Sequence, residues 1–348
     1  MAGPTNRSDV SISTAGLQRI LQYEPHDLTI SVEAGLAWSE FERALAANRQ
    51  MVPLDPPWSS AATVGGVIAS NSSGPRRRLY GTARDFVIGM KFATLEGKLA
   101  QSGGMVVKNV AGLDMAKLMI GSFGTLAAIA VVNFKVLPAP ESERSFLVPF
   151  STLAEAIAAR NTLLKSVLQP SAVDLLNPGA SAATGGEGWL LAIRAGGVPA
   201  AVARYEREIS DLGNLRTLEN SGQEIFWKQA REFTPRFLEG HPDGAVVRAS
   251  CTLKETEGVI AAFDGSVIAR AGSGVCYGYF DRAETAAGWV ADAARRGWKA
   301  VVEHCAEERK RELALWPSPG GDFEIMKRVK SLFDPKNLLN SGRLWGRI

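Results

Sequence analysis

The first part of the chain carries hydrophobic patterns of two different periods, which predict both strands and helices. Residues 27–35 are rich in β-branched side chains and end in glycine, as expected of a strand. In the next segment Trp38, Phe41 and Leu45 recur at spacings of three and four residues. Because this is the spacing of one helix face, residues 37–50 are predicted to form an amphipathic helix.

The pattern then predicts a hairpin, a helix and a strand. Residues 86–104 resemble two short strands joined by a glutamate–glycine turn. Residues 111–124 are predicted to form a helix closed by a pair of glycines, and residues 125–140 a strand that ends at prolines. We therefore place the first domain boundary at residue 140.

After residue 140, helical and strand patterns alternate without a sequence repeat, which predicts an α+β domain with an antiparallel sheet. The final segment, 322–344, predicts a helix, a proline-containing turn and a short tail. The resulting division is 1–140, 141–315 and 316–348. The predicted helices are 151–166, 199–213 and 281–297, and the predicted strands are 188–196, 243–253 and 274–280.

Composition narrows the class of protein. The chain has 348 residues, of which 46% are hydrophobic, so it can bury a sizeable core. A net charge of +3 is too small to indicate nucleic-acid binding, and the run Arg76-Arg77-Arg78 is expected to be a solvated turn. No segment has the pattern of a signal peptide or a membrane span.

Three cysteines, Cys251, Cys276 and Cys305, are widely spaced in the sequence. Their number and spacing disfavour a disulfide framework, a tetrahedral zinc site or an iron–sulfur cluster within this chain. We expect no metal site, and the cysteine content fits a reducing, cytoplasmic compartment.

The strongest candidate for chemistry is the glycine-rich stretch 61–89. Gly65 and Gly66 would let the main chain approach a flat or anionic ligand, with the short polar side chains of Thr63, Ser70 and Asn71 beside them. The stretch contains neither the dinucleotide fingerprint nor a P-loop. A plain turn between two elements is the alternative reading of the glycine pair alone.

The wider context of this stretch resembles a known family. Five motifs occur in order between residues 33 and 126. They are the strand ending Glu-Ala-Gly, the Thr-Val-Gly-Gly turn, Tyr-Gly followed by Arg-Asp-Phe-Val-Ile-Gly, Val-Lys-Asn-Val-Ala-Gly-Leu-Asp, and Gly-Ser-Phe-Gly-Thr-Leu. This combination resembles the FAD-binding domain of the vanillyl-alcohol oxidase and p-cresol methylhydroxylase (PCMH) type. Within that superfamily the chain looks like the E-subunit family of bacterial glycolate oxidases. The resemblance is strong over residues 20–140 and moderate at the tail.

The resemblance implies a PCMH-type FAD-binding domain followed by an α+β cap domain, with the C-terminal helix and tail returning to the flavin domain. It also assigns roles to individual residues. Backbone amides at the glycine pair would follow the FAD diphosphate and ribityl chain, a second group would lie near or behind the flavin ring, a third would hold the adenine half, and two tail residues would reach the flavin. In that order these residues are Thr63, Val64, Gly65 and Gly66; Ala69, Ser70, Asn71, Gly74, Tyr80 and Gly81; Gly121, Gly124, Thr125 and Ile129; and Asn340 and Arg343.

Each of these assignments has a simpler alternative. Gly121 and Gly124 could end a helix, and Thr125 could begin a strand. In the tail, Ser341 replaces the proline of the family motif, which implies a less rigid segment than in the family.

Two departures from the family concern the cofactor. The family's FAD domain opens with a strand–turn–strand unit whose Gly/Ser-rich loop holds the other side of the diphosphate. In this sequence that unit is absent, so the domain is expected to be incomplete at its N-terminus. The histidine or cysteine that binds FAD covalently in some relatives is also missing, so FAD is expected to be held non-covalently.

A third departure concerns catalysis. Hydroxy-acid oxidising relatives carry a metal-binding histidine cluster in the cap, whereas this chain has only His26, His241 and His304. His304, on an apparent helix among charges, is the one weak candidate for a general base, and a solvated surface histidine is the alternative. Independent substrate oxidation is therefore not expected.

Three functions remain open from the sequence. The first is the FAD-binding subunit of a glycolate oxidase-like complex, in which a 2-hydroxy acid is oxidised and electrons pass to a catalytic flavin subunit and an iron–sulfur subunit. The second is a self-sufficient FAD-dependent hydroxy-acid or alcohol dehydrogenase, for which Arg194, Arg248 and His304 are the available cap residues. The third is a cofactor-free scaffold subunit. A cytoplasmic protein is expected, attached to the inner membrane, if at all, through its partners.

Overall fold

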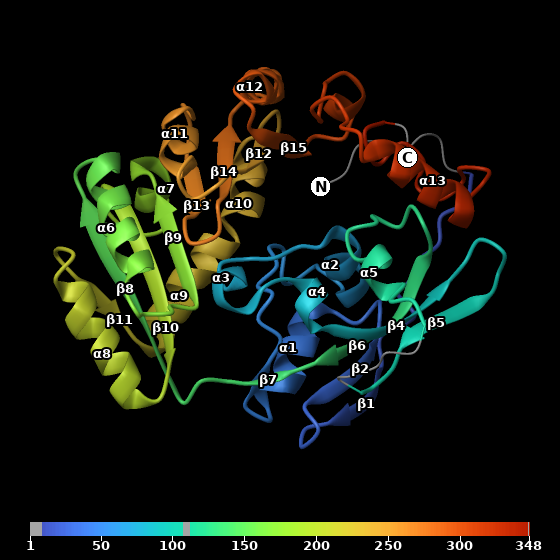
Figure 1. Cartoon of the computed structure of the whole chain (residues 1–348), viewed down its shortest axis with the longest axis horizontal. Coiled ribbons are helices and arrows are strands. Elements are labelled where there is room, and N and C mark those ends of the chain that lie inside the picture. Colours follow the sequence, from blue (N-terminus) through green and yellow to red (C-terminus); the bar gives the residue numbers. More distant parts are fainter. Residues whose placement is uncertain (1–8, 107–111, 347) are drawn as a thin grey trace. The chain divides into compact units, whose positions relative to one another are not determined.

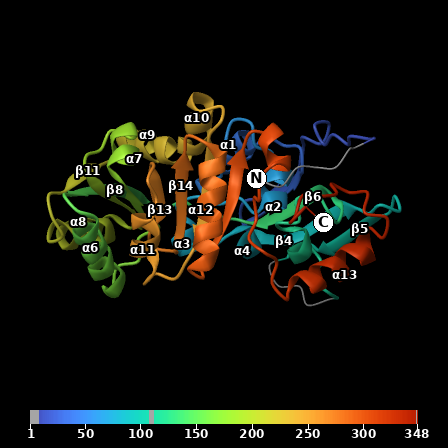
Figure 2. The same ribbon diagram turned by 90° about the horizontal axis from the view of Figure 1, so that it is seen from above.

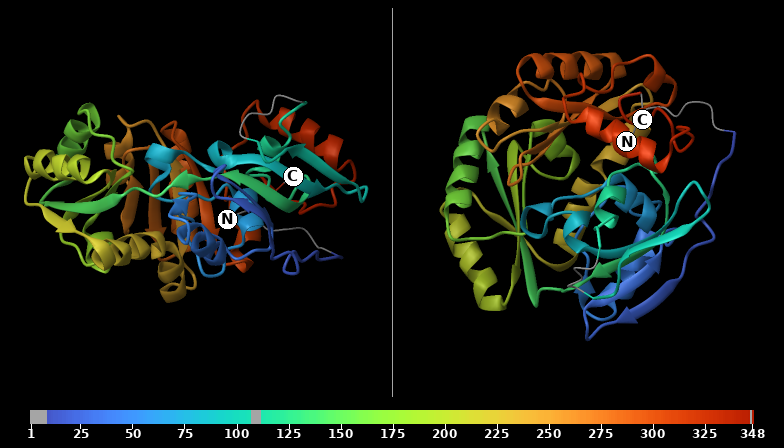
Figure 3. Two further views of the ribbon diagram at one scale, coloured as in Figure 1. Left: turned by 90° about the horizontal axis from the view of Figure 1, so that it is seen from below. Right: turned by 45° about the vertical axis from the view of Figure 1, so that its right-hand side comes forward.

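The computed structural model describes residues 9–106, 112–346 and 348 and divides the chain into two compact units. The first unit contains the described residues up to Gly74 together with Gly81–Ala139 and Ser318–Ile348. The second contains Pro75–Tyr80 and Pro140–Pro317. Figure 3 shows the last segment of the chain, in red, returning to the blue and teal strands of the first unit.

The first unit is built on a five-stranded antiparallel sheet with the strand order β1-β2-β6-β4-β5 (Figure 1). Every residue of β2 is buried, because its two neighbours β1 and β6 cover both edges and the helix Val64–Ser70 packs against it. A second, two-stranded sheet pairs β3 with β7. The strands are β1 Ile20–Glu24, β2 Thr29–Glu33, β3 Gln50–Met51, β4 Val87–Ala93, β5 Leu99–Gly103, β6 Ala128–Lys135 and β7 Leu137–Pro138.

The helices of the first unit are short apart from two. In α1, Trp38, Phe41 and Leu45 are buried, and the Phe41 ring lies 5.1 Å from that of Phe134 on β6, so the predicted apolar face is the one that packs. The helices are α1 Trp38–Ala46, α2 Val64–Ser70, α4 Ala83–Phe86, α5 Ala116–Met119 and α13 Phe323–Phe333.

Two local predictions in this unit are wrong. The expected helix over 111–124 is reduced to the single turn α5, because Gly121 and Gly124 both have positive φ angles that end a right-handed helix. The glycine pair is not in a turn, because Gly65 and Gly66 form part of α2. Residues 107–111 of the Val-Lys-Asn-Val-Ala-Gly-Leu-Asp motif lie outside the described residues.

The second unit is built on an eight-stranded antiparallel sheet with the order β11-β8-β10-β9-β13-β14-β12-β15. The predicted strands in the cap region are present, and their central residues are buried. The strands are β8 Ser142–Phe150, β9 Ala172–Leu176, β10 Trp189–Gly197, β11 Arg216–Leu218, β12 Ala245–Ser250, β13 Val267–Arg270, β14 Val275–Phe280 and β15 Lys299–Cys305.

Helices cover both faces of this sheet (Figure 2). One apolar cluster joins the sheet to α6, α8, α11 and α12, and a second joins its other face to α7, α9 and α10. Their bounds are α6 Leu153–Lys165, α7 Pro178–Ala183, α8 Pro199–Ser210, α9 Asn220–Arg231, α10 Phe233–Gly240, α11 Thr256–Ala261 and α12 Ala283–Arg295, and the short α3 spans Arg77–Tyr80.

The architecture confirms the predicted fold class, an α+β protein whose sheets are antiparallel. The expected helix around His304 is wrong, because that residue lies on strand β15 between α12 and the 3₁₀ turn Glu308–Arg311. Among the described residues, no helix combines the length and the apolar character needed to cross a membrane.

Candidate functional site

The amides of the Thr63–Gly66 segment donate hydrogen bonds within the protein. Thr63 is the N-cap of α2, and its hydroxyl accepts from the Gly66 N–H at 3.2 Å. The N–H groups of Val64 and Gly65 donate to the carbonyls of Leu36 and Ala34, at 2.9 and 2.7 Å. These amides are therefore committed to holding α2 against the β2–α1 connection.

The two adjacent glycines differ in what surrounds the position where a side chain would begin. A Cβ on Gly65 would lie 2.8 Å from the Ala34 Cβ and 3.0 Å from its carbonyl oxygen, so close backbone packing requires glycine there. Gly66 is exposed, and a Cβ there would meet only the Thr63 hydroxyl, at 3.1 Å. Of the pair, Gly66 is the glycine that leaves an open surface for a ligand.

The C-terminal end of α2 is joined to the turn formed by residues 121–125. The N–H groups of Gly121 and Phe123 donate to the carbonyls of Ile68 and Ala69, at 3.1 and 2.8 Å. Asn71 ends α2 in a left-handed conformation with φ of 49°, and its Cβ would be 3.5 Å from a Cβ on Gly121. The structure thus brings Ala69, Asn71 and Gly121 together from two segments.

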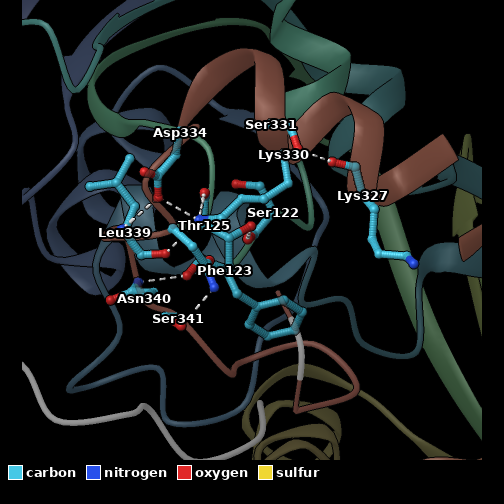
Figure 4. A network of polar contacts seen from close by, with 11 residues as sticks. Ser122, Phe123, Thr125, Lys327, Lys330, Ser331, Asp334, Leu339, Asn340 and Ser341 are labelled. Carbon is cyan, nitrogen blue, oxygen red and sulfur yellow. Dashed lines mark hydrogen bonds and ion pairs between the residues drawn. The ribbon is translucent and has the colours of Figure 1, made fainter. Parts of the chain in front are cut away.

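A buried lysine connects the same turn to the C-terminal helix (Figure 4). The Lys330 ammonium on α13 donates to the Thr125 carbonyl at 2.7 Å and to the Leu339 carbonyl at 2.9 Å, and pairs with the Asp334 carboxylate at 2.6 Å. The side chains of Lys330 and Asp334 are only 6% and 0% exposed. The acceptor strength of three oxygens compensates for the loss of water around the ammonium group.

The carboxylate of this pair is held in its charged form. Burial opposes ionisation of Asp334, but hydrogen bonds from Lys330 and from the Leu338 and Leu339 amides outweigh it, and the pKa of Asp334 is lowered. Asp334 also fixes the tail, since the Leu339 N–H donates to its Oδ2 at 2.7 Å.

The tail residue Asn340 contacts the same turn directly. Its amide donates to the Phe123 carbonyl at 2.8 Å, and its nitrogen would lie 2.7 Å from a Cβ on Gly124, whose φ is +69°. The Arg343 N–H donates to the Asn340 carbonyl at 3.3 Å, which closes a turn in the tail. Asn340 and Gly124 thus form one contact between segments far apart in the sequence.

We expect Gly124→Ala to weaken this contact measurably. The methyl group adds the strain of a positive φ, about 1 kcal/mol, and displaces the Asn340 amide from Phe123, about 1 kcal/mol more. The free energy of unfolding from urea titration should therefore fall about twice as far as in Gly97→Ala. Gly97 is the matched control, because its φ is +77° and its surroundings are open. Equal losses in the two variants would contradict the role of the Asn340 contact.

The remaining predicted residues are distributed more widely. Gly74 packs on Asp55, Gly81 packs on the Asp85 carboxylate, and Ile129 is buried on β6 opposite Phe92. Tyr80 ends α3 and belongs to the second unit. Thr125 is buried and bonds its own turn through Ser122. Packing explains these positions without a ligand.

The open surface of the first unit fits part of FAD. Gly66 and Ser70 lie one turn apart on α2, and the exposed Asn71 side chain makes no hydrogen bond within the described part of the chain. Glycines at 66 and 121 leave room for a flat ring, and the Asn71 amide can both donate to and accept from it. The residues present fit the flavin or ribityl part, whereas the α2 amides are not available to the diphosphate.

A second group of candidate residues lies on one face of the cap sheet. Arg248 on β12 lies directly opposite Tyr277 on β14, and the Arg270 guanidinium lies 5.5 Å from the centre of the Tyr277 ring. Arg248 pairs with Glu303 at 2.8 Å, and Arg270 pairs with the buried Asp174. The same face carries the apolar cluster with α9 and α10 at the neighbouring positions of these strands.

The residues just described, Arg248, Arg270, Tyr277, Glu303 and Asp174, are called the cap group below. The basic run of the glycine-rich stretch is close enough to the cap group for their charges to interact. The expected solvated turn is wrong, because Arg76, Arg77 and Arg78 are only partly exposed and belong to the second unit. Burial lowers the pKa of Arg77, as do Arg248 and Arg270, while Tyr277 and Glu303 act in the opposite direction. Arg78 donates to the carbonyl of Pro170 at 3.3 Å.

The electrostatics of the cap group favour an anion. Burial opposes the charge on Arg270, but Asp174 and two tyrosines outweigh it and raise its pKa. Burial raises the pKa of the Tyr277 phenol, with Glu303 adding to the shift, so Tyr277 is a hydrogen-bond donor at neutral pH. Three arginines and two carboxylates lie in this group, with Arg248 paired to Glu303 and Arg270 paired to Asp174.

The weak catalytic candidate lies in a different environment from the expected one. His304 is 8% exposed on β15, and burial lowers its pKa well below the usual value, so its imidazole is neutral. Arg194 pairs with Glu143 and lies 5.9 Å from the Trp227 ring, on a strand away from the Arg248 group. In the described residues no three side chains of the histidine, cysteine or acidic type form a metal-binding group.

Sequence reasoning missed Arg77, Arg270, Tyr277, Lys330 and Asp334. The run of three arginines was a signal for the first of these. An α13 lysine four residues before an aspartate is common on exposed helices, so nothing local marked the Lys330–Asp334 pair as buried.

Known protein families match both ends of the chain. The family described as FAD binding domain matches residues 1–103, and the family described as FAD linked oxidases, C-terminal domain, matches residues 289–344. The chain is 42% identical over 127 residues to glycolate oxidase subunit GlcE of Escherichia coli (strain K12), which covers 36% of each protein. It is 24% identical over 368 residues to glycolate oxidase subunit GlcD of Bacillus subtilis (strain 168), covering 95% of this chain and 78% of GlcD.

A third relative, D-lactate dehydrogenase of Anaerostipes hadrus, is 32% identical over 167 residues, which cover 48% of this chain and 35% of that enzyme. The matches to GlcE and to this enzyme therefore span about a third of those relatives. The solved structure of p-cresol methylhydroxylase with substrate bound superposes with a TM-score of 0.73 at 15% identity, over 94% of this chain and 78% of that one. Alkyldihydroxyacetonephosphate synthase superposes with a TM-score of 0.67 at 19% identity, over 93% and 65%.

The fold is therefore the PCMH-type FAD-binding fold, and the matched domains make FAD the cofactor. Both ends of the chain are thus similar to FAD-linked oxidoreductases, and the relatives that it matches include glycolate oxidase subunits and a D-lactate dehydrogenase.

Proposed function

We propose that this chain is the FAD-binding subunit of a glycolate oxidase-like complex, which takes part in the oxidation of a small 2-hydroxy acid. Electrons would leave through a partner flavin subunit and an iron–sulfur subunit. The similarity to GlcE, the highest identity among the three relatives described above, supports the subunit role. The fit of Gly66, Ser70, Asn71 and Gly121 to the flavin part supports cofactor binding in this chain.

The proposed substrate class rests on the presence of Arg248, Arg270 and Tyr277 on one face of the cap sheet. Guanidinium groups bind carboxylates through paired, charge-assisted hydrogen bonds, and a protonated phenol adds a further donor. Burial strengthens such bonds because water competes less for the carboxylate. A small 2-hydroxy acid matches this site in charge and in its hydrogen-bonding groups.

FAD, when bound, supplies the two-electron oxidation of the substrate α-carbon. The chain's residues would orient the substrate for that step. Arg248 and Tyr277, from adjacent strands, would fix the carboxylate and thereby the direction of the α-carbon. Arg270 would hold the Tyr277 ring in place, while Asp174 fixes Arg270.

Replacing Arg248 should weaken substrate binding selectively. We expect Arg248→Met to raise the half-saturating concentration of glycolate or D-lactate by about ten- to a hundredfold, because one charge-assisted contact is worth roughly 1.5–3 kcal/mol. Arg248→Lys should recover part of the loss. Arg194→Met is the matched control, because Arg194 is also ion-paired on this sheet but belongs to another pair. The measurement is flavin reduction in the assembled complex, and similar effects of the two methionine variants would count against the site.

The subunit role is tested by spectroscopy of the purified proteins. The chain co-purified with its partner subunits should show flavin absorbance near about 450 nm and anaerobic bleaching by the hydroxy acid. A complex in which this chain contains no flavin would overturn the proposal.

A self-sufficient dehydrogenase is the second candidate, favoured by the alignment to GlcD over 95% of the chain. Bleaching of the isolated chain by glycolate or D-lactate, without partners, would select it over the subunit role. In either case we propose non-covalent FAD, since none of the three cysteines, Cys251, Cys276 and Cys305, lies in the glycine-rich stretch 61–89. Denaturation should then release all flavin into the supernatant. The cytoplasmic location stays a prediction, tested by cell fractionation.

A further inference from the structure

Two of the three cysteines, far apart in the sequence, lie together on adjacent strands of the cap sheet. In the β12–β14 register Ala249 lies opposite Cys276, and the Cys251 N–H donates to the Gly274 carbonyl at 2.8 Å. Cys251 is therefore the diagonal neighbour of Cys276 on the same face of an antiparallel pair. Both pack on the apolar cluster of that face, Cys276 as a buried member and Cys251 as a partly buried one. Diagonal side chains on antiparallel strands are within mutual reach.

The surroundings of the two sulfur atoms differ. The Cys251 Sγ lies 3.8 Å from the Thr256 hydroxyl and 3.6 Å from the Gly274 carbonyl. The neighbouring Cys276 thiol lowers the pKa of Cys251 to about 7, with Thr256 and Arg160 adding to the shift and burial and Glu255 acting against it. The same pairing and burial raise the pKa of Cys276. One member of the pair is therefore a partly ionised thiolate and the other a thiol.

A buried arginine keeps positive charge beside this pair. Arg160 is 1% exposed, and both its terminal nitrogens donate to the Leu253 carbonyl at 3.1 Å, with one also reaching the Ala271 carbonyl at 3.2 Å. The Leu253 carbonyl belongs to the segment after β12 that begins with Cys251, and the Ala271 carbonyl to the turn that precedes β14, the strand of Cys276. Because backbone carbonyls carry no formal charge, the guanidinium of Arg160, on which Cys251, Cys276 and Glu257 act electrostatically, favours a nearby anion such as a thiolate.

We propose that Cys251 and Cys276 form a peroxide-oxidisable thiol pair that closes to a disulfide within the cap. The Cys251 thiolate attacks one oxygen of a hydroperoxide, its sulfur is oxidised to a sulfenic acid, and the O–O bond is reduced to hydroxide. The Cys276 sulfur then attacks the sulfenic sulfur, the S–O bond breaks, and the thiol proton leaves with the hydroxyl as water. Two thiols and one hydrogen peroxide thus give one disulfide and two waters.

The third cysteine provides an internal comparison. Cys305 is partly buried on β15, and burial raises its pKa, so it is mainly a protonated thiol at neutral pH. Thiolate content and exposure govern oxidation, so Cys305 should react more slowly than Cys251. A disulfide at Cys251–Cys276 would join the end of β12, the strand of Arg248, covalently to β14. This inference does not depend on the proposed function.

The test is to treat the full chain with one equivalent of hydrogen peroxide and to count thiols after denaturation. The three thiols of the reduced chain should fall to one, and the cross-linked Cys251–Cys276 peptides should be lighter by about 2 Da than the sum of the reduced peptides. Cys276→Ser should stop at a sulfenic acid trapped by dimedone at Cys251, and Cys305→Ser should behave like the parent chain.

The pH dependence separates this reaction from non-specific oxidation. The initial rate should rise with a midpoint near the Cys251 pKa of about 7, which reflects Cys276, Thr256, Arg160 and Glu255 around the sulfur. Oxidation of Cys305 before Cys251, an unchanged rate in Cys251→Ser, or three thiols remaining after treatment would each overturn the proposal.

Discussion

Lys330→Met is expected to lower the free energy of unfolding by about 3–5 kcal/mol, because it leaves a buried carboxylate without its cation. The Asp334 side chain is 0% exposed, and the carbonyls of Thr125 and Leu339 would also lose their donor. The measurement is urea unfolding, combined with amide exchange in α13, which should become less protected if the helix separates from the 121–125 turn.

The matched control is Lys327→Met, one helical turn earlier. Lys327 pairs with Glu324 at 2.6 Å, but the two side chains are 43% and 72% exposed. An exposed pair contributes about 0.5 kcal/mol or less, so this variant should be close to the parent protein. Similar losses in both variants would show that helix propensity, and not the buried pair, sets the effect.

The difference between Lys330→Met and the parent chain should depend on pH. In the parent protein the Asp334 pKa is below its usual value of 3.8, so its contribution to stability is present at neutral pH and is lost as pH falls through the folded-state value. Without Lys330, burial favours the protonated acid. The stability gap should therefore narrow between about pH 7 and pH 4, and a constant gap would contradict the electrostatic explanation.

Gly66→Leu is expected to weaken FAD binding by about a hundredfold while leaving the apoprotein as stable as before. A side chain at this position meets only the Thr63 hydroxyl at 3.1 Å, and leucine has a higher helix propensity than glycine. The added side chain would occupy the open surface assigned to the flavin. Fluorescence titration of apoprotein with FAD measures the affinity, and thermal unfolding measures the stability.

The control for this variant is Gly288→Leu, an exposed glycine within helix α12 that has nothing within 4 Å of its Cβ position. It should leave FAD affinity unchanged. Unaltered affinity in Gly66→Leu would remove the Gly66 surface from the flavin site. A loss of stability in Gly66→Leu alone would instead show that the position is closed by packing.

Elements with a strong local period could be predicted from the sequence. The α1 face of Trp38, Phe41 and Leu45 is buried as its spacing indicates, and the hairpin of β4 and β5 turns where expected. The helix expected over 111–124 failed, because the positive φ values of Gly121 and Gly124 depend on contacts with Asn71 and Asn340 that periodicity does not encode. His304 was assigned to a helix because its charged neighbours hid the alternation of buried and partly exposed residues along an edge strand.

The residues of the candidate site could also be predicted from the sequence only in part. The glycine-rich motif drew attention to Gly66 and Asn71, and both lie on the open surface of α2 and its end. Gly65 belongs to the same motif but serves the packing on Ala34. The sequence could not separate these two glycines, because the difference lies in a neighbour from another part of the chain.

By itself, the sequence determined the α+β class, the run of family motifs and the amphipathic faces, since each depends on residues close together in the chain. Only the tertiary structure decided that Lys330 binds a carbonyl 205 residues away, that Arg77 joins the cap, and that Cys251 meets Cys276. The physical reason is that burial and strand register determine the charge state and partners of a polar side chain. Both arise from long-range packing, which leaves no periodic signal in the sequence.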